Sequence, residues 1–449
     1  MDVIMPDLLA ARSLMAMALG FHIVFALAGI GLPLMMVMAE WRWLRTGDEP
    51  SLTLAKRWAK VTTILFAIGA VTGTILSFLL GLLWPTFMVW AGPIIGLAFS
   101  LEGFAFFAEA IFLGLYLYGW RLLSPAAHLL SGVAVALSGV ASAVFVVQAN
   151  GWMNTPRGFR LLDGQPTEID PLAAMLNPAG LGQAPHMILA AYVATGFVVA
   201  GIHAFQLLRE PDNILHQRAL RIALLVGGVS VLLQLVSGDI LAKVVADYQP
   251  AKLAALEGQF RTEAGAPLRL GGLPDVEQGV LRYAVEIPYG LSFLLYLDPN
   301  AVVTGLDAIP RDQWPPVGVV RMAFQIMMFS GFAMACVTLW GLWLWWRRVS
   351  LFRSRAFLIA LVLAAPLGVV ATEAGWTATE VGRQPWIIVG VMKTAEAVTP
   401  MPGLFVPLVI FVLLYLFLGA MVLRILWGPI AASRTTDSSN RHERGPYVP

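Results

Sequence analysis

About nine apolar runs, each roughly 20 residues long, most constrain what this 449-residue chain can fold into. A helix of that length crosses a hydrocarbon core of roughly 30 Å. Because the core holds no water to satisfy backbone N–H and C=O groups, such runs must be helical. We therefore predict an all-α integral membrane protein. The predicted spans are about 13–41, 58–83, 93–119, 125–148, 184–208, 219–238, 319–346, 356–375 and 404–427.

The composition agrees with this class of protein. Hydrophobic residues make up 58% of the chain and charged residues only 12%, about half of what a soluble domain uses. The formal net charge of +2 does not indicate a nucleic-acid partner, because the basic residues lie in short loops rather than in one patch. A lone cysteine, Cys336, excludes a disulfide framework and any metal cluster held by several thiolates.

The charges of the connections predict the orientation in the membrane. The first, third, fifth and seventh connections carry the basic residues, whereas the second, about 84–92, has no charge. Loops rich in Lys and Arg stay in the cytoplasm, so we expect the N-terminus outside and the C-terminus inside. The basic residues concerned are Arg42, Arg45, Lys56, Arg57, Lys60, Arg121, Arg209, Arg218, Arg221, Arg347, Arg348, Arg353 and Arg355.

Two external segments are longer than simple turns. They cover about 149–183 and about 239–318, and the second mixes both charges with many prolines and glycines. Loops longer than about 15 residues usually carry function or are disordered. We therefore divide the chain into a membrane domain, 1–432, which includes the external region 239–318, and a flexible cytoplasmic tail, 433–449.

Two carboxyl groups lie within the third predicted span. Glu102 and Glu109 are seven residues apart, so they share one helix face and are separated by about 10 Å along the axis. Counted from Pro93, Glu102 lies roughly 13 Å deep and Glu109 lies near the middle of the membrane. A single buried acid is often neutral and hydrogen-bonded. Two acids on one stripe favour a proton path or a ligand set.

The histidines fall into two groups. We interpret His128, His203, His216 and His442 as solvated or interfacial side chains. His22, within the first span, and His186, at the outer start of the fifth, each need a partner for both ring nitrogens. Imidazole is a frequent axial ligand of haem iron, and a methionine thioether is a frequent second ligand. Spacing alone does not select a methionine among the 18 present.

The segment from Glu373 to Trp386 closes the eighth span. It brings Glu373, Glu380 and Arg383 to a depth at which unpaired charges are costly, so they must pair or bind something. Pro385 disfavours a helical conformation at the residue before it. An arginine there suits a buried propionate or another anion.

These residues resemble one family, subunit I of the cytochrome bd-type quinol oxidases. The resemblance is carried in chain order by EGFAFFAE at 102–109, QANGWMNTP at 148–156, LNPAGLGQAPH at 176–186, KLAALE at 252–257, FQIM at 324–327 and GWxxxExGRQPW at 375–386. The motifs extend along nearly the whole chain, and GRQPW together with ANGWM is highly specific.

The resemblance implies three haems and assigns roles residue by residue. His186 and Met327 match the ligands of a low-spin haem b. His22 matches the ligand of one high-spin haem, and Glu380 matches the carboxylate bound to the other. Glu102 and Glu109 match acids along the oxygen site and proton route, and Lys252 and Glu257 match quinol-binding residues of the external loop. Trp376 and Arg383 resemble groups that lie among the haems.

Two departures from the longer members of the family indicate a short-loop, cyanide-insensitive branch. Gln325 stands two residues before the ligand Met, where longer members have Arg, and the stretch from Glu257 to Phe324 is short. Members of this branch carry either haem d or a third haem b at the oxygen site, alongside the low-spin and high-spin haems b.

The resemblance also implies the reaction and the partners. Quinol is oxidised near the outer face of a bacterial inner membrane, and dioxygen is reduced to water with cytoplasmic protons, for which Glu109 is the predicted relay. Subunit II and a small single-span subunit are the expected protein partners, with quinol, O2 and the lipid bilayer as the others.

Two other readings account for part of the sequence. A secondary transporter explains the intramembrane acids and histidines but not GRQPW or the predicted His/Met ligand pair. A dihaem electron-transfer cytochrome usually pairs histidines on two helices, and such pairs do not occur here.

Overall fold

The computed structural model describes the backbone of residues 4–432 and the side chains of residues 7–425. The predicted tail, 433–449, lies outside the described residues. The chain forms two compact units, one of residues 22–399 and one of residues 1–21 with 400–449.

Long helices dominate both units. Within the described residues, nine are long and apolar enough to cross a membrane, which confirms the predicted class and number of spans. The sidedness of the termini stays a prediction. The helices are α1 (Ile4–Thr46), α2 (Glu49–Leu83), α3 (Pro85–Tyr118), α4 (Pro125–Asn154), α6 (Pro178–Leu207), α7 (Ile214–Tyr248), α10 (Val317–Trp346), the pair α11 (Arg355–Ala364) and α12 (Leu367–Gly382), and α14 (Phe405–Ala432).

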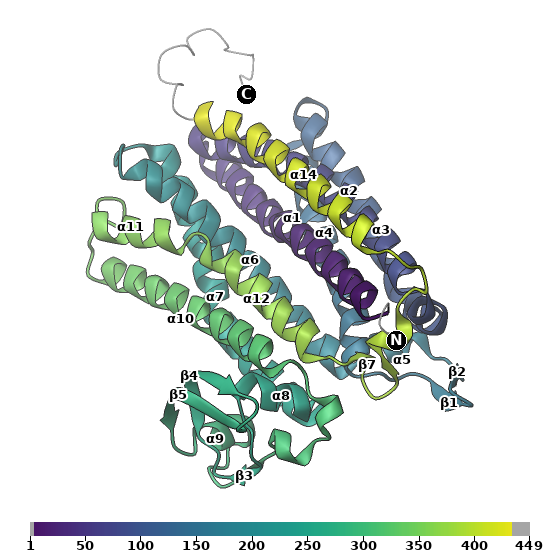
Figure 1. The fold of residues 1–449 in the computed structure, drawn as a ribbon. Coiled ribbons are helices and arrows are strands. Elements are labelled where there is room, and N and C mark those ends of the chain that lie inside the picture. Colours follow the sequence, from purple (N-terminus) through teal and green to yellow (C-terminus); the bar gives the residue numbers. More distant parts are fainter. Residues whose placement is uncertain (1–3, 433–449) are drawn as a thin grey trace. The chain divides into compact units, whose positions relative to one another are not determined.

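In the unit of residues 22–399, the most extensive helix contacts join α6 to α7, α3 to α4, and α10 to α12 (Figure 1). Small residues permit the closest approach. A Cβ added at Gly196 of α6 would lie 2.5 Å from the Cα atom of Gly227 on α7. Close backbone contact of this kind stabilises helix pairs in lipid, where burial of apolar side chains gives little driving force.

Side-chain caps fix where several helices begin. Ser124 accepts a hydrogen bond from the N–H of Ala127, and Asn177 accepts one from the N–H of Gly180. Each cap satisfies a backbone donor that the first turn of a helix leaves free. Asn177 also donates to the backbone carbonyl of Gln148, so this cap connects the start of α6 to the end of α4.

The structure corrects three predicted boundaries. Residues 84–92 are not a loop, because α3 begins at Pro85, directly after Trp84. Proline suits the first position of a helix, where its missing N–H is not needed. The eighth span is interrupted between α11 and α12 at Pro366, which cannot donate to a helical hydrogen bond. Helix α7 continues to Tyr248, so the predicted region 239–318 begins inside a helix.

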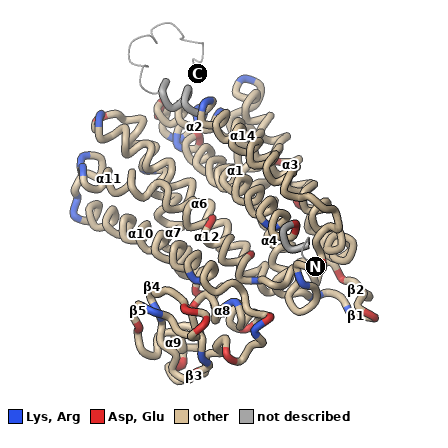
Figure 2. The backbone as a smooth tube through the Cα atoms, viewed as in Figure 1, with Lys and Arg blue, Asp and Glu red and all other residues tan. Residues whose placement is uncertain are grey.

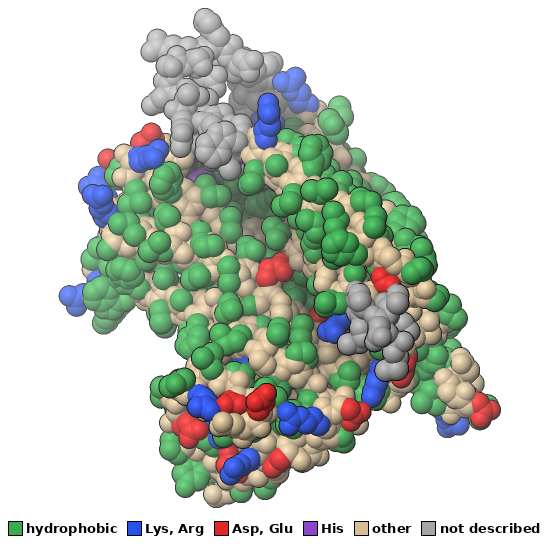
Figure 3. Space-filling view, viewed as in Figure 1, with side chains coloured by type: hydrophobic (Ala, Val, Ile, Leu, Met, Phe, Trp, Pro, Cys, Tyr) green, Lys and Arg blue, Asp and Glu red, His purple; other side chains and the backbone are tan. Residues whose placement is uncertain are grey.

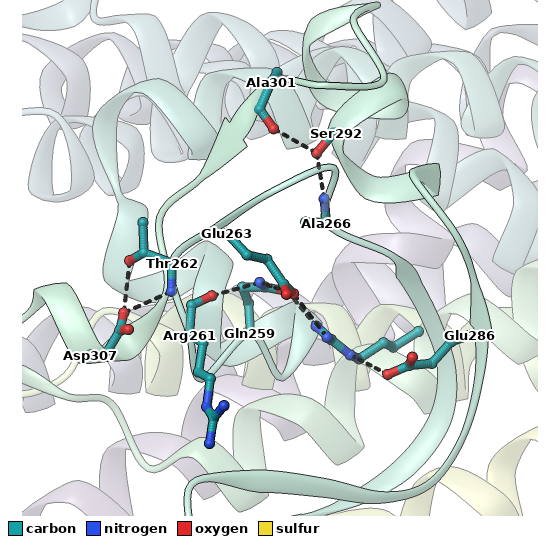
Figure 4. Close-up of polar contacts among 10 residues, drawn as sticks. Gln259, Arg261, Thr262, Glu263, Ala266, Glu286, Ser292, Ala301 and Asp307 are labelled. Atoms are coloured by element: carbon teal, nitrogen blue, oxygen red, sulfur yellow. Dashed lines mark hydrogen bonds and ion pairs between the residues drawn. The ribbon is translucent and has the colours of Figure 1, made fainter.

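The segment 249–316 is an ordered loop region that packs on α7 and α10. Its longest strands, β4 (Leu268–Asp275) and β5 (Val280–Ile287), form an antiparallel hairpin, and β3 (Glu263–Ala264) pairs with β6 (Val302–Val303). Its helices are α8 (Pro250–Glu257), α9 (Gly290–Tyr296), η2 (Leu306–Ala308) and η3 (Arg311–Gln313). Gln259, Glu263 and Glu286 belong to a polar network inside it (Figure 4).

The remaining short elements lie in connections. They are η1 (Gly119–Arg121), β1 (Arg160–Leu162), β2 (Gln165–Thr167), α5 (Pro171–Met175), β7 (Trp386–Ile388), β8 (Met392–Lys393) and α13 (Thr394–Ala397). In the unit of residues 22–399, charged residues gather at helix ends and on the loop region 249–316 (Figure 2). Hydrophobic side chains cover much of the surface between them (Figure 3).

The smaller unit joins the start of α1 to α14. The N–H of Leu404 donates to Asp7 over 2.9 Å, and the rings of Phe21 and Tyr415 lie 4.7 Å apart. These contacts connect the two ends of the chain.

Candidate haem and quinol sites

His186 lies on α6, and its two ring nitrogens face α7. Nδ1 is 3.0 Å from Ser237 Oγ, and Nε2 is 3.0 Å from the side-chain nitrogen of Gln234. The Ser237 hydroxyl donates its own proton to the carbonyl of Gln234, so it accepts from Nδ1–H of the histidine. This arrangement leaves a lone pair on Nε2, the state that a metal-ligating imidazole needs.

His22, on α1, has the same arrangement with a different helix. Its Nδ1 is 3.0 Å from Thr72 Oγ1 on α2. The Thr72 hydroxyl donates to the carbonyl of Ile68 over 2.9 Å, so it too accepts from the histidine. Both predicted axial histidines therefore carry their proton on Nδ1 and a lone pair on Nε2. In His186 that lone pair accepts from the side-chain amide of Gln234.

Each of the three predicted neutral ligands also faces a glycine. A Cβ added at Gly73 would lie 3.0 Å from His22 Cε1, one at Gly238 would lie 3.5 Å from His186 Cε1, and one at Gly375 would lie 3.0 Å from the sulfur of Met327. Glycine permits close approach of a bulky group to the backbone. Imidazole and thioether are donor types that hold haem iron, so the chemistry of these side chains fits a haem.

Glu380, near the end of α12, is held by two neighbours. Asn150 of α4 donates a hydrogen bond to Oε1, and Arg383 forms an ion pair with Oε2 at 2.5 Å. The pairing of Glu380 and Arg383 that the sequence predicted is thus present. Trp376 is half-buried on α12, one turn before Glu380.

Two hydrogen-bond donors of Arg383 are unused among the described residues. Its side chain is buried, and among the described residues its Nε and Nη1 atoms have no hydrogen-bond partner. Glu373 also has one buried oxygen, Oε1, without a partner. Buried polar groups are normally satisfied, and two free guanidinium donors suit a carboxylate such as a propionate.

A polar chain connects Glu380 to the loop region. Lys252 of α8 donates to Asn154 Oδ1 over 2.6 Å, and the side-chain amide of Asn154 donates to Asn150 Oδ1 over 3.3 Å. Asn150 in turn holds Glu380. The pKa of Lys252 is lowered to about 7, chiefly by burial and also by nearby Arg383, while Glu380 opposes the shift.

Glu257 ends α8 and faces a different group. Its Oε2 atom is 3.7 Å from Nη1 of Arg321 on α10. The pKa of Glu257 is raised to about 7, because the effect of burial outweighs the opposing effect of the cations Arg321 and Arg269. The structure therefore places Lys252 and Glu257 on one short helix but gives them separate partners.

Arg321 is a residue that the sequence interpretation missed. Its side chain is fully buried (0% exposed). It donates to the backbone carbonyls of Leu256, Arg269 and Gly271 at 2.6–2.7 Å. Gln325, one turn later on α10, accepts from the N–H of Gly271 over 2.9 Å. A charged residue four positions into a span was the signal that could have identified it.

The two acids of α3 lie at a different level of their helix from the level predicted. Because α3 begins at Pro85 rather than Pro93, Glu102 is near its middle and Glu109 is nearer its second end. Ser142 of α4 donates to Glu102 over 3.2 Å. Glu109 is buried beside α4, where a Cβ at Gly139 would lie 3.4 Å from both carboxyl oxygens.

The interpretation of three histidines as solvated or interfacial needs correction. His128 is 3% exposed and its Nδ1 lies 2.7 Å from Glu40. His216 is also buried, and its Nδ1 lies 2.9 Å from Nδ1 of the partly buried His203. Glu40 is 88 positions from His128, so the local sequence around that histidine does not reveal its partner. His442 lies outside the described residues.

Comparison with known proteins identifies the family of the chain. Residues 10–433 match the family model for cytochrome bd terminal oxidase subunit I. A putative cytochrome bd menaquinol oxidase subunit I from Bacillus subtilis is 38% identical over 429 residues, which cover 94% of this chain and 96% of the relative. The cytochrome bd ubiquinol oxidase subunit 1 of the same organism is 31% identical over 98% of this chain and 96% of the relative.

A solved structure gives the same result. The bd oxidase from Geobacillus thermodenitrificans contains a chain with a TM-score of 0.90 and 40% sequence identity, covering 95% of this chain and 98% of that one. The resemblance inferred from the motifs is confirmed. This chain therefore belongs to the cytochrome bd terminal oxidase subunit I family, and it is the catalytic subunit of a quinol oxidase of the bacterial inner membrane.

Proposed function

We propose that the chain oxidises quinol at the Lys252 and Glu257 loop region on the outer face and reduces dioxygen to water with cytoplasmic protons. The observation that carries this proposal is the polar chain from Lys252 through Asn154 and Asn150 to Glu380. It connects a predicted quinol residue to a predicted haem ligand. The positive-inside distribution of the loops supports the sidedness.

The family uses haems, and the proposed set is a low-spin haem b, a high-spin haem b, and haem d or a third haem b. His186 and Met327 would hold the low-spin haem, His22 one high-spin haem, and Glu380 the other. Bound haems supply electron transfer and oxygen binding. The residues themselves orient the ligands: Ser237 and Thr72 fix the histidine tautomers, and Arg383 offers free donors for a propionate.

Protons and quinol are handled by side chains. Glu257, as a carboxylate, would accept a proton from a quinol hydroxyl, and Lys252 would donate a hydrogen bond to an oxygen of the head group. Glu102 and Glu109 would hold protons on their way from the cytoplasmic side. Cytochrome bd oxidases form a complex with subunit II; we propose subunit II and a small single-span subunit as partners here. The tail 433–449 is proposed to be cytoplasmic.

Oxygen uptake driven by quinol, together with a reduced-minus-oxidised spectrum of the purified complex, tests the function. We expect uptake that requires quinol and haem bands of both spin classes. A complex without high-spin bands or without uptake would contradict the proposal. Uptake that persists in cyanide is expected of the proposed short-loop branch.

The pH dependence of quinol oxidation is expected to report Glu257. Because the carboxylate form accepts the proton, activity should rise as pH increases through about 7, the pKa of this residue. Arg269→Gln removes a cation that lowers this pKa, so the rising limb should move to higher pH. The measurement is kcat against pH with the haem content verified.

Arg282→Gln is the matched control for that experiment. Arg282 lies in the same hairpin and pairs with Asp275 at 2.8 Å, away from Glu257, so its loss should not move the limb. One contradicting result is a rising limb of the pH profile that stays in place in Arg269→Gln, and another is a limb that shifts equally in both variants. Either result would exclude Glu257 as the titrating group.

Glu109→Gln tests the proton route. An amide cannot release a proton, so we expect turnover and membrane-potential generation in proteoliposomes to fall at least about tenfold, within the range of lost acid–base steps. The haem spectrum should be unchanged. Glu49→Gln, at an exposed position, is the control. Full turnover with full potential in Glu109→Gln would rule out the relay.

A further inference from the structure

The hairpin of β4 and β5 does not extend away from the helices but runs back beside α10. The N–H of Gly271, in β4, donates to Gln325, and the carbonyls of Arg269 and Gly271 accept from Arg321. Gln325 is eight residues beyond Val317, where α10 begins, or about 12 Å along the helix axis. Because α10 is one of the candidate spans, the hairpin lies beside its first turns.

The hairpin has one polar and one apolar face near its base. Directly opposed residues of an antiparallel pair share a face. Arg269 opposes Glu286, and their side chains form an ion pair at 2.9 Å that faces the loop region. The alternate pairs, Leu268 with Ile287 and Leu270 with Val285, are apolar.

The apolar face is largely uncovered among the described residues. Val285 is 66% exposed, and Tyr283 beside it is 86% exposed. Short helix α9, which packs against Leu268 and Ile287 at Gly290, adds exposed Phe293. Hydrophobic side chains reach the surface of this region beside the charged ones (Figure 3).

The surroundings identify what covers this face. The part of α10 beside the hairpin exposes apolar side chains of its own, Val319, Met322 and Ile326, as a helix surrounded by lipid does. Tyrosines such as Tyr283 and Tyr289 are enriched where the hydrocarbon core meets the head groups. The apolar face therefore continues a lipid-facing helix surface at the depth of the interface.

We propose that the β4–β5 hairpin is an interfacial anchor whose Tyr283, Val285 and Ile287 side chains insert into the lipid leaflet on the side of the loop region. Lipid covers the apolar face, at the level where the head groups meet the acyl chains. Insertion holds the loop region against the bilayer, which is where a lipid-soluble quinol arrives. The proposal is independent of the haem assignments.

Spin labels test the anchor in the complete oxidase reconstituted in phosphatidylcholine and phosphatidylglycerol nanodiscs. Val285→Cys and Tyr283→Cys would each be labelled in a Cys336→Ala background, with cysteines of the other subunits replaced. Label at the native Cys336, on α10, is the reference within the spanning helix. Asp163→Cys, at the exposed turn between β1 and β2, is the aqueous reference.

We expect labels at 285 and 283 to be accessible to oxygen and several-fold less accessible to a water-soluble nickel chelate than the label at 163. Doxyl lipids labelled near the head group should broaden their signals more than lipids labelled near the chain end. Chelate accessibility equal to that at 163 would overturn the proposal. So would immobile labels shielded from both oxygen and the chelate, because that result indicates cover by another protein.

Discussion

Replacing His186 with alanine is expected to abolish the low-spin haem signal and, with it, quinol-dependent oxygen uptake. His186 is the proposed ligand, and its lone pair lies on Nε2 because Ser237 accepts the proton of Nδ1. A methyl group cannot bind iron, so a haem with Met327 as its remaining ligand would be lost or converted to high spin. The measurement is a reduced-minus-oxidised spectrum with haem content per complex.

Two further variants make that experiment specific. His22→Ala should remove high-spin signal and spare the low-spin band, so the two histidine variants serve as controls for each other. Ser237→Ala should keep the His186 ligand but remove the hydrogen bond that orients its ring. We expect haem affinity to fall by about ten- to a hundredfold. A low-spin band that survives His186→Ala, or disappears equally in His22→Ala, would show that the ligand assignment is wrong.

The sequence predicted the fold because each span carries its signal within one local segment. Apolar runs of sufficient length give helices wherever they lie, so all nine were found. The boundaries were less accurate near prolines. The third span was counted from Pro93. Pro85 instead begins α3, since proline at the first helical position loses no hydrogen bond. Pro366 divides one predicted span into α11 and α12.

The site was predictable only in part, because its contacts join distant segments. Motifs pointed to Glu380 as a candidate ligand, but Asn150, which donates a hydrogen bond to Glu380, is 230 positions away. Nothing local to Asn150 indicates that partner. The glycines that face His22, His186 and Met327 were likewise invisible, because a glycine in a membrane helix has many uses. Spatial proximity, rather than residue type, distinguishes them.

The contacts of Arg321 also join distant segments, so they could not be predicted from the local sequence. Among such contacts, we expect those of Arg321 to matter most for the loop region. Replacing it with methionine is expected to detach β4 from α10. Three backbone carbonyls, of Leu256, Arg269 and Gly271, would lose their donor. A hydrogen bond to a charged group contributes about 1.5–3 kcal/mol, so the loss should amount to several kcal/mol locally. Methionine has a similar length, which limits the effect of lost packing.

Detachment of β4 from α10 should be visible in three measurements on the intact complex. Segment 259–316 should become sensitive to limited proteolysis, the amide of Gly271 should exchange its hydrogen faster, and quinol-dependent uptake should fall because Glu257 loses its neighbour at 3.7 Å. The low-spin band should persist, since Met327 lies on the same helix two turns beyond. Arg353→Met, which breaks only an exposed pair with Asp212, is the control. A protease-resistant loop with normal quinol oxidation in Arg321→Met would mean that the buried arginine does not hold the quinol site.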